Sequence, residues 1–224
     1  MKRYPENDFI RRFSSVVFLA GAVLLLAACT KTINVYHPPR VDLKQFGRLG
    51  LITFSDNARP SVADYATEQF QNRVQSAQVG IPIVELGPIQ QVLRSVGSNQ
   101  LDFRTMQKIG KQYKVSAVFV GTLVYSDIKT DVKLKDIAKL DASVNTTLNA
   151  TLSVKLFETD GGATIWSDST AWKRKLGKFS VNEYNGVSVR TKGYEDAYQK
   201  LVPDMVQDVT RDFRGYYVRE SVKK

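Results

Sequence analysis

Hydrophobic and polar positions change their period near residue 130, and this change divides the chain into two parts. Before it stand three compact apolar runs, each next to turn residues or to a helical pattern, which is typical of buried strands. They are RLGLITF (48–54), IPIVEL (81–86) and SAVFVGTLVYSDI (116–128).

Between these runs, apolar residues recur three to five positions apart, which predicts three amphipathic helices. We expect Ser61 to cap the first helix. The second is expected to begin at Pro88 and to stop at Gly97, because proline suits the first helical position and glycine the end of a helix. Asp102 is expected to cap the third helix.

After the change of period, apolar or small residues fall mostly on even numbers over 131–157, which indicates an extended chain. One strand of this length would exceed the roughly 3–10 residues usual for strands, so we expect a turn within 133–139. Thr159-Asp160-Gly161-Gly162 predicts a second turn, from which residues 163–175 return as the partner strand.

Asn185-Gly186 predicts a further hairpin within residues 179–191. A helical stripe from about Tyr194 to Phe213 closes the chain, and Pro203 inside it predicts a kink or a later start. Together these elements predict an α/β fold, a mixed sheet with helices packed on its face and an antiparallel hairpin extension.

The first 28 residues differ from the rest of the chain. A charged segment precedes an apolar stretch from Phe13 to Ala28, and a single cysteine, Cys29, follows. This is the layout of an export signal, and the stretch is shorter than the roughly 20 residues of a spanning helix. We therefore expect residues 1–28 to be a signal peptide, with a secretory signal or membrane helix and a chance cysteine as the alternative.

The sequence LAAC (26–29) resembles the lipobox of bacterial lipoproteins, in which Leu and two small residues precede the cysteine. The resemblance implies that Cys29 carries a diacylglyceryl group and fatty acyl chains such as palmitate, which anchor the protein to a membrane. Asp after the acylated cysteine retains Gram-negative lipoproteins in the inner membrane. Thr30 and Lys31 follow here, which implies the outer membrane, with the domain facing the periplasm.

Composition and periodicity also predict a tether, a single domain and a tail in the rest of the chain. Residues 29–47, which contain Pro38-Pro39 and show no clear period, are expected to be the acylated Cys29 and a tether. Residues 48–214 are expected to be a single domain and residues 215–224 a basic tail.

The net charge of +10 would suggest nucleic acid in a cytosolic protein, but export makes that partner unexpected. Lipid headgroups, peptidoglycan or an acidic partner are the candidates, beside a solvated basic surface. KRKLGK (173–178) is expected to be a solvated hairpin shoulder, with an anchor for an anionic partner as the alternative.

The sequence offers no phosphate loop, paired-histidine spacing or cysteine cluster. His37, the only histidine, falls in the expected tether, which is a poor platform for a catalytic triad or a metal site. We therefore expect no catalytic residue, no metal site, no cofactor and no enzymatic activity. Tyr125, Trp166 and Trp172 are expected in the core or on a sheet face rather than in a ligand stack.

The stretches IGKQYKVSAVFVG (109–121) and ETDGGATIWS (158–167) resemble segments of a superfamily of envelope proteins. It includes the curli-secretion channel lipoproteins (CsgG), the lipoprotein activators of penicillin-binding proteins (LpoB) and the amino-terminal domain of TolB. The likeness covers roughly residues 45–214 and implies their α/β fold. In this superfamily the channel is an oligomeric pore with two inserted hairpins per subunit, whereas the activators dock a soluble domain on a synthase.

The matching hairpins would lie near residues 127–148 and 173–193. Asp136 interrupts the first, and pairing across Asn185-Gly186 leaves polar residues on both faces of the second, so neither face of it suits lipid. We therefore expect a non-enzymatic, outer-membrane-anchored periplasmic lipoprotein that acts as a docking or accessory module of a cell-envelope complex. Its envelope protein partner is not identified, a homo-oligomer stays open, and a curli-channel-like secretion pore is the alternative.

Overall fold

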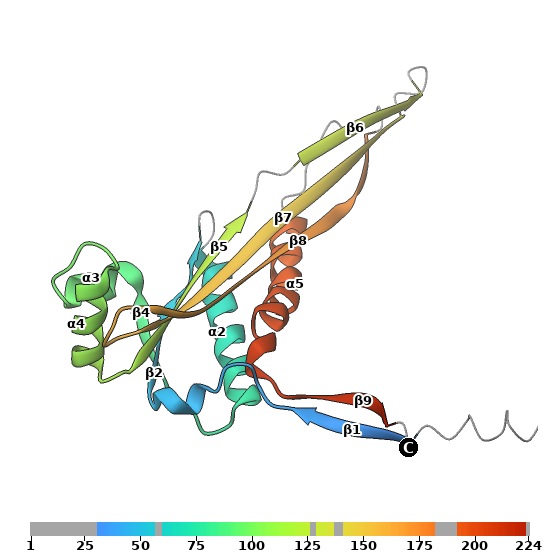
Figure 1. Cartoon of the computed structure of the whole chain (residues 1–224). Helices are drawn as coiled ribbons and strands as arrows, with labels where there is room; N and C mark the ends of the chain where they lie inside the picture. Colours follow the sequence, from blue (N-terminus) through green and yellow to red (C-terminus); the bar gives the residue numbers. More distant parts are fainter. Residues whose placement is uncertain (1–30, 57–59, 126–128, 137–140, 182–191, 223–224) are drawn as a thin grey trace, which may run out of the picture. The chain divides into compact units, whose positions relative to one another are not determined.

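A computed structural model of the chain describes residues 31–56, 60–125, 129–136, 141–181 and 192–222 (Figure 1). The chain divides into two units, one formed by Pro39–Gly215 and the other by Met1–Pro38 together with Tyr216–Lys224. No helix in the described ranges is long and apolar enough to cross a membrane.

In the part of the chain that the structure describes, the larger unit is built on a mixed sheet of seven strands. They are β2 (Leu49–Thr53), β3 (Ser55–Asp56), β4 (Ile83–Pro88), β5 (Ala117–Tyr125), β6 (Lys129–Asp136), β7 (Asp141–Glu158) and β8 (Thr164–Val181). Strand β2 pairs in parallel with β4 and β5, whereas β7 pairs antiparallel with β5, β6 and β8. The parallel half follows from the helices that join its strands, and the antiparallel half from the direct turns.

Strand β7 organises the antiparallel half of the sheet. Its residues 150–158 pair with β5 and its residues 141–147 pair with β6, whereas β8 pairs with it from 142 to 157. Because a strand has only two edges, β5 and β6 lie end to end along one edge of β7 and β8 occupies the other (Figure 1).

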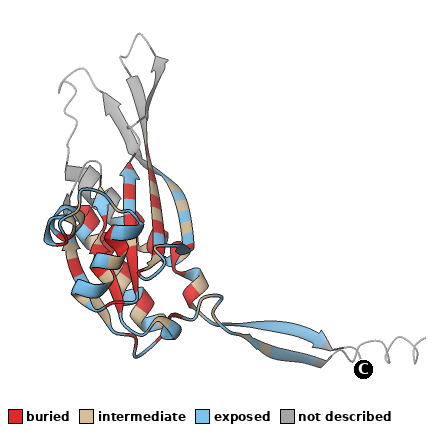
Figure 2. Cartoon of the chain, turned by 60° about the vertical axis from the view of Figure 1, so that its left-hand side comes forward, coloured by how far each residue is buried: buried red, intermediate tan, exposed pale blue. Residues whose placement is uncertain are grey.

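The described residues include four α-helices and two short 3₁₀ helices. They are η1 (Leu43–Phe46), α2 (Pro60–Ala77), α3 (Ile89–Ser95), α4 (Phe103–Tyr113), α5 (Lys192–Val209) and η2 (Arg211–Phe213). Side chains from α2 and α5 share one core with one face of the sheet, and side chains from α3 and α4 share a second core with the other face. In Figure 2 the buried residues, in red, lie along the strands and on parts of the helices.

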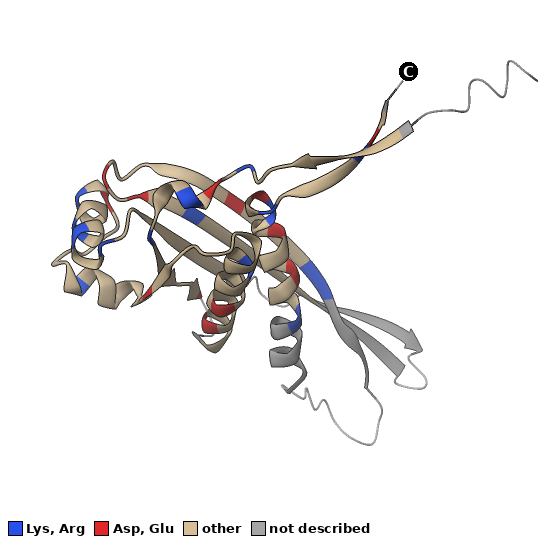
Figure 3. Cartoon of the chain, turned by 90° about the horizontal axis from the view of Figure 1, so that it is seen from below, with Lys and Arg blue, Asp and Glu red and all other residues tan. Residues whose placement is uncertain are grey.

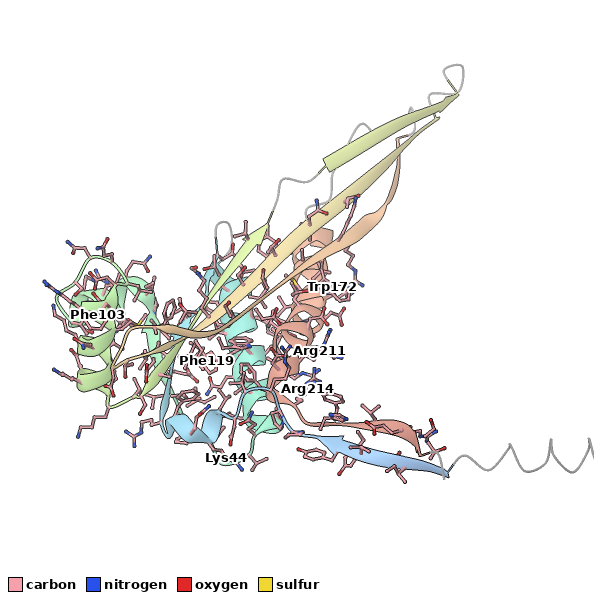
Figure 4. All side chains as sticks on the ribbon, in the orientation of Figure 1. Lys44, Phe103, Phe119, Trp172, Arg211 and Arg214 are labelled. Atoms are coloured by element: carbon pink, nitrogen blue, oxygen red, sulfur yellow. The ribbon has the colours of Figure 1, made fainter. Side chains whose placement is uncertain are left out.

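Aromatic rings fill the core under α2 and α5. The ring centroid of Phe70 of α2 lies 5.1 Å from that of Phe119 of β5 and 5.2 Å from that of Phe54. The ring centroids of Phe213 and Phe119 lie 5.7 Å apart. Phe119 lies at the centre of this cluster (Figure 4). Edge-to-face rings at these distances bury large apolar areas, so this cluster is a main source of stability for the unit.

The predicted fold class is confirmed, and so is the cap of α4, where the Asp102 carboxylate accepts a hydrogen bond from the Thr105 amide at 2.8 Å. The prediction that Ser61 caps α2 is wrong, because the helix begins one residue earlier, at Pro60. Proline takes the first position of a helix readily, since its missing N–H would be unpaired there. The prediction that the second helix runs from Pro88 to Gly97 is also wrong in its bounds, because Pro88 ends β4 in an extended conformation and α3 spans Ile89–Ser95, with Val96 as its C-cap.

The turns predicted in the antiparallel half agree with the strand ends. β6 ends at Asp136 and β7 begins at Asp141, and the turn at Thr159–Gly162 joins β7 to β8. The hairpin predicted across Asn185-Gly186 falls outside the described residues, which resume at Lys192, the first residue of α5. Helix α5 continues through Pro203.

The smaller unit is a two-stranded antiparallel ribbon of β1 (Lys31–His37) and β9 (Tyr216–Val222). The tether expected at 29–47 and the tail expected at 215–224 thus contain paired strands, although neither segment shows a clear apolar period. Leu43, also expected in the tether, is fully buried in the core of the larger unit. A single long-range pairing carries little periodic signal when both strands are exposed, which explains why the sequence did not reveal it.

Candidate interaction surface

The residues singled out by the sequence do not converge on one site. Cys29 lies outside the described residues. His37 lies on β1, where its ring stacks on Tyr216 with centroids 5.1 Å apart. Tyr125 and Trp166 are buried in the core, as expected, and Trp172 packs half-buried against it.

Both tryptophans of β8 join the sheet to the C-terminal helical segment. The indole N–H of Trp166 donates to a carboxylate oxygen of Asp212 at 3.2 Å, and that of Trp172 donates to Asp208 at 2.9 Å. Figure 4 shows Trp172 on β8 beside α5. Buried indoles need such partners, so these two residues serve the packing of the sheet on α5.

Acidic and histidine side chains in the described ranges do not form a group of three or more that could hold a metal ion.

One stretch of the sheet is left uncovered by the described helices, and we call it the open face. Its residues are exposed or half-buried and alternate with core residues along β5, β7 and β8. They are Thr122, Val124, Thr151, Ser153, Lys155, Ser167, Ser169 and Ala171, together with Ser55 of β3. In Figure 1 this is the side of β5, β7 and β8 opposite α2 and α5.

Hydroxyl groups form a row across four neighbouring strands of the open face. Ser55 pairs with Thr122, Thr122 with Ser153, and Ser153 with Ser169. The Ser55 hydroxyl donates to that of Thr122 at 3.1 Å, and the hydroxyls of Ser153 and Ser169 lie 2.8 Å apart. Register and hydrogen bonds therefore agree that the four side chains point to the same side.

The row next to it is formed by small side chains, of which Val124 and Ala171 are apolar. Val124 pairs with Thr151, which pairs with Ala171, and Val124 is 45% exposed. Short neutral side chains lose little conformational entropy when another surface covers them, unlike lysine or glutamate. Each hydroxyl can both donate and accept a hydrogen bond, so the face can match a partner of either polarity. These properties suit a flat docking surface better than a reaction centre.

Exposed basic residues gather in two regions, on β8 and on α4. Lys173 and Arg174 continue β8 as exposed residues, whereas the side chains of the remaining KRKLGK residues lie outside the description. Helix α4 carries exposed Arg104, Lys108 and Lys111, and Figure 3 shows basic residues gathered there and acidic ones along α2 and α5. Part of the positive charge of the chain is thus concentrated on α4 and on β8.

The sequence carries a weak signal for the open face. Odd-numbered residues are short over 151–153 and 167–171. These short residues form one surface only because of the register between β7 and β8, which the sequence does not show. Ser55 joins the hydroxyl row from β3, a strand of two residues.

Neither a protein-family model nor a curated relative matches this sequence. Among solved structures, the chain is similar to a PelC dodecamer subunit from Paraburkholderia phytofirmans, with 10% identity and a TM-score of 0.41, over 82% of this chain and 98% of that one. It is also similar to the lipoprotein GNA1162 from Neisseria meningitidis (15% identity, TM-score 0.36, 73% and 98% covered). A third is the LpoB C-terminal domain from Escherichia coli (17% identity, TM-score 0.32, 59% and 87% covered).

Bacterial lipoproteins and an LpoB domain are thus among the similar structures. TM-scores this low establish neither a shared function nor a shared mode of assembly. The resemblance to the curli channel and to TolB stays a prediction.

Proposed function

We propose that this protein is an outer-membrane-anchored periplasmic lipoprotein that acts as a non-enzymatic docking or accessory module of a cell-envelope complex. Two observations support the proposal. The sequence LAAC (26–29) places a lone cysteine after an export-signal pattern. The open face then offers an uncovered surface on the body that the anchor would hold at the membrane.

The open face is the observation that carries the docking role. An exposed sheet face usually gains solubility from long charged residues, but Thr122, Ser153 and Ser169 present short hydroxyls with exposed Val124 beside them. A partner can approach such a surface closely and satisfy its hydroxyls with hydrogen bonds. Lys155 is the charged member of the face and lies in its outermost row.

Site-specific photo-crosslinking tests the docking role in the full-length protein in its own membrane. A photoreactive amino acid replaces Ser169 in one variant and Ser76, an exposed residue of α2, in the control. We expect a discrete adduct with an envelope protein from residue 169 and a weaker one or none from residue 76. Equal adducts from both positions, or none from residue 169, would show that the open face does not dock a partner.

Sizing after mild detergent extraction separates this function from the oligomeric secretion pore. A monomer, a dimer or a complex with a different protein agrees with the docking module. A ring of many copies of this chain alone would favour the pore instead.

A further inference from the structure

The ribbon of β1 and β9 has two faces of different chemistry. In its register, residues directly opposite each other share a face. One face carries Ile33, Val35, His37, Tyr216, Val218 and Glu220. The other, which we call the tyrosine face, carries Thr32, Asn34, Tyr36, Tyr217, Arg219 and Ser221.

The tyrosine face is exposed along its whole length (Figure 2). Tyr36 is 53% and Tyr217 is 72% exposed, although their rings lie only 5.2 Å apart. None of the six residues of this face is acidic, and Arg219 gives it a positive charge. Glu220 lies on the other face, where its carboxylate is 3.7 Å from Nε2 of His37.

A two-stranded ribbon on its own is marginally stable in water. Here the larger unit holds the two ends together, since the Val41 amide donates to the Asp212 carbonyl at 3.2 Å and the Arg40 guanidinium pairs with the Asp212 carboxylate at 3.3 Å. The conformational entropy lost when β1 and β9 are brought together is therefore offset by contacts within the larger unit. Most residues of the ribbon are nevertheless exposed, so an external surface would stabilise it.

We propose that the tyrosine face of the ribbon lies against the headgroups of anionic phospholipids, as a second membrane contact beside the lipid anchor. The proposal rests on the anchoring of Cys29. Cys29 stands two residues before the start of β1, so an anchored chain delivers the ribbon to the headgroup region. Tyrosine favours this region because its ring prefers the hydrocarbon boundary and its hydroxyl the water.

The charge of the tyrosine face is complementary to this surface. Arg219 lies on this face, in register with Asn34. Each basic residue close to an anionic leaflet is attracted to it, and guanidinium binds phosphate through paired hydrogen bonds. A protein partner would not require the combination of exposed tyrosines, a positive charge and an adjacent lipid anchor.

The lone cysteine makes this proposal testable in the whole acylated protein. Acylation blocks the Cys29 thiol, so a second cysteine introduced into the mature protein is the sole site for a thiol-reactive fluorophore. Asn34→Cys and Ser221→Cys place the probe on the tyrosine face from either strand, and Ser76→Cys places it on α2 as the control. The labelled proteins are reconstituted in vesicles of phosphatidylethanolamine and phosphatidylglycerol.

We expect headgroup-spin-labelled lipid to quench the probes at 34 and 221 more strongly than the probe at 76, and aqueous iodide to quench them less. Arg219→Glu should remove this difference, because it reverses the charge on the face. Iodide quenching at 34 and 221 equal to that at 76 would overturn the proposal. Protection from iodide without quenching by lipid would also overturn it, and would indicate a protein or a second copy on this face.

The parent protein without an added cysteine separates the two proposals. Labelling of the parent would show that Cys29 is a free thiol. The proposals of the lipid anchor and of the ribbon contact would then both be wrong. If the parent does not label and the ribbon probes are open to iodide, the anchor stands and the ribbon contact alone is wrong.

Discussion

Gly110 of α4 lies so close to Thr159 that a methyl group at position 110 would stand 2.6 Å from both Cβ and Oγ1 of Thr159. The Thr159 hydroxyl lies 2.9 Å and 3.0 Å from the carbonyl oxygens of Val115 and Ser116, to which it donates. The turn between β7 and β8 is thereby fixed to the end of α4. The two sequence stretches on which the resemblance rests meet at this contact.

Gly110→Ala should therefore lower the free energy of unfolding by about 1–2 kcal/mol. Overpacking costs about 1–3 kcal/mol, which exceeds the gain of up to about 1 kcal/mol from the better helix propensity of alanine. Urea denaturation measures the change. Gly161→Ala is the control, because its nearest neighbour is the mobile end of Glu158 at 3.1 Å, and it should change stability by less than about 0.5 kcal/mol. An equal loss in both variants would contradict the explanation.

Asp208 should contribute to stability through the donors of β8. Its carboxylate accepts hydrogen bonds from the Trp172 indole at 2.9 Å and the Thr170 hydroxyl at 3.3 Å. Asp208→Ala leaves both donors without this acceptor and should cost about 1–2 kcal/mol, the lower part of the range for charged hydrogen bonds, because the side chain is 31% exposed. Thermal unfolding followed by tryptophan fluorescence measures it.

Asp204→Ala provides the matched control, since Asp204 is an exposed carboxylate one turn earlier on the same helix. We expect its effect to stay within about 0.5 kcal/mol. If the two aspartates prove equivalent, the indole bond does not stabilise the packing of β8 on α5.

Local patterns predicted the elements of the larger unit well, because each of them depends on neighbours in sequence. The cap of α4 needs only Asp102 and Thr105, and the turn after β7 is signalled locally by Gly162, which adopts a φ of 62°. Lys114, which ends α4 in the left-handed region with φ of 55°, carries no such signal, because that conformation favours glycine.

The candidate surfaces could not be predicted in the same way, because they depend on register between distant residues. Ser55 and Thr122 are separated by 67 positions, and Tyr36 and Tyr217 meet only because β1 pairs with β9. Alternation tells which residues share a face of one strand but not which strand lies beside it. The hydroxyl row and the tyrosine face therefore emerged from the structure.

The Asp102 cap predicts a pH dependence. The hydrogen bond from the Thr105 amide, with a smaller contribution from the Thr105 side chain, lowers the pKa of Asp102 below its ordinary value of 3.8. A carboxyl whose pKa is lower in the folded state stabilises that state above its unfolded pKa of about 4, and this contribution is lost as the pH falls through the folded pKa.

Asp102→Asn keeps an acceptor at the cap but does not titrate. The wild-type protein should therefore lose stability relative to this variant as the pH is lowered below about 4. Urea denaturation across this range measures the difference between the two proteins. Parallel pH profiles would show that the cap does not require the ionised carboxylate.

Replacement of the lipidation site should release the protein from the membrane. Cys29→Ser, expressed behind a secretory leader that is cleaved before residue 29, cannot form the thioether, and each lost acyl methylene removes about 0.8 kcal/mol of membrane binding. The variant should appear in the soluble fraction with an unchanged circular dichroism spectrum. Thr30→Ser is the control and should stay in the membrane. Retention of Cys29→Ser in the membrane would indicate that another part of the chain inserts.

Ser169→Arg should separate docking from folding on the open face. Residue 169 is exposed, so the larger side chain can extend into water, and the loss of one hydroxyl pair with Ser153 should change stability by less than about 1 kcal/mol. In a complex the same side chain would bring a charge and a bulky stem into a row of short hydroxyl side chains, which should weaken the association at least about tenfold, equal to about 1.4 kcal/mol.

Ser76→Arg adds the same side chain to α2, outside the open face, and should leave the association unchanged. Urea denaturation of both variants and the recovery of the crosslinked partner with each measure the two effects. If both arginines weaken the association equally, the added charge acts at long range and the open face has no special role. If neither does so, the partner binds elsewhere on the protein.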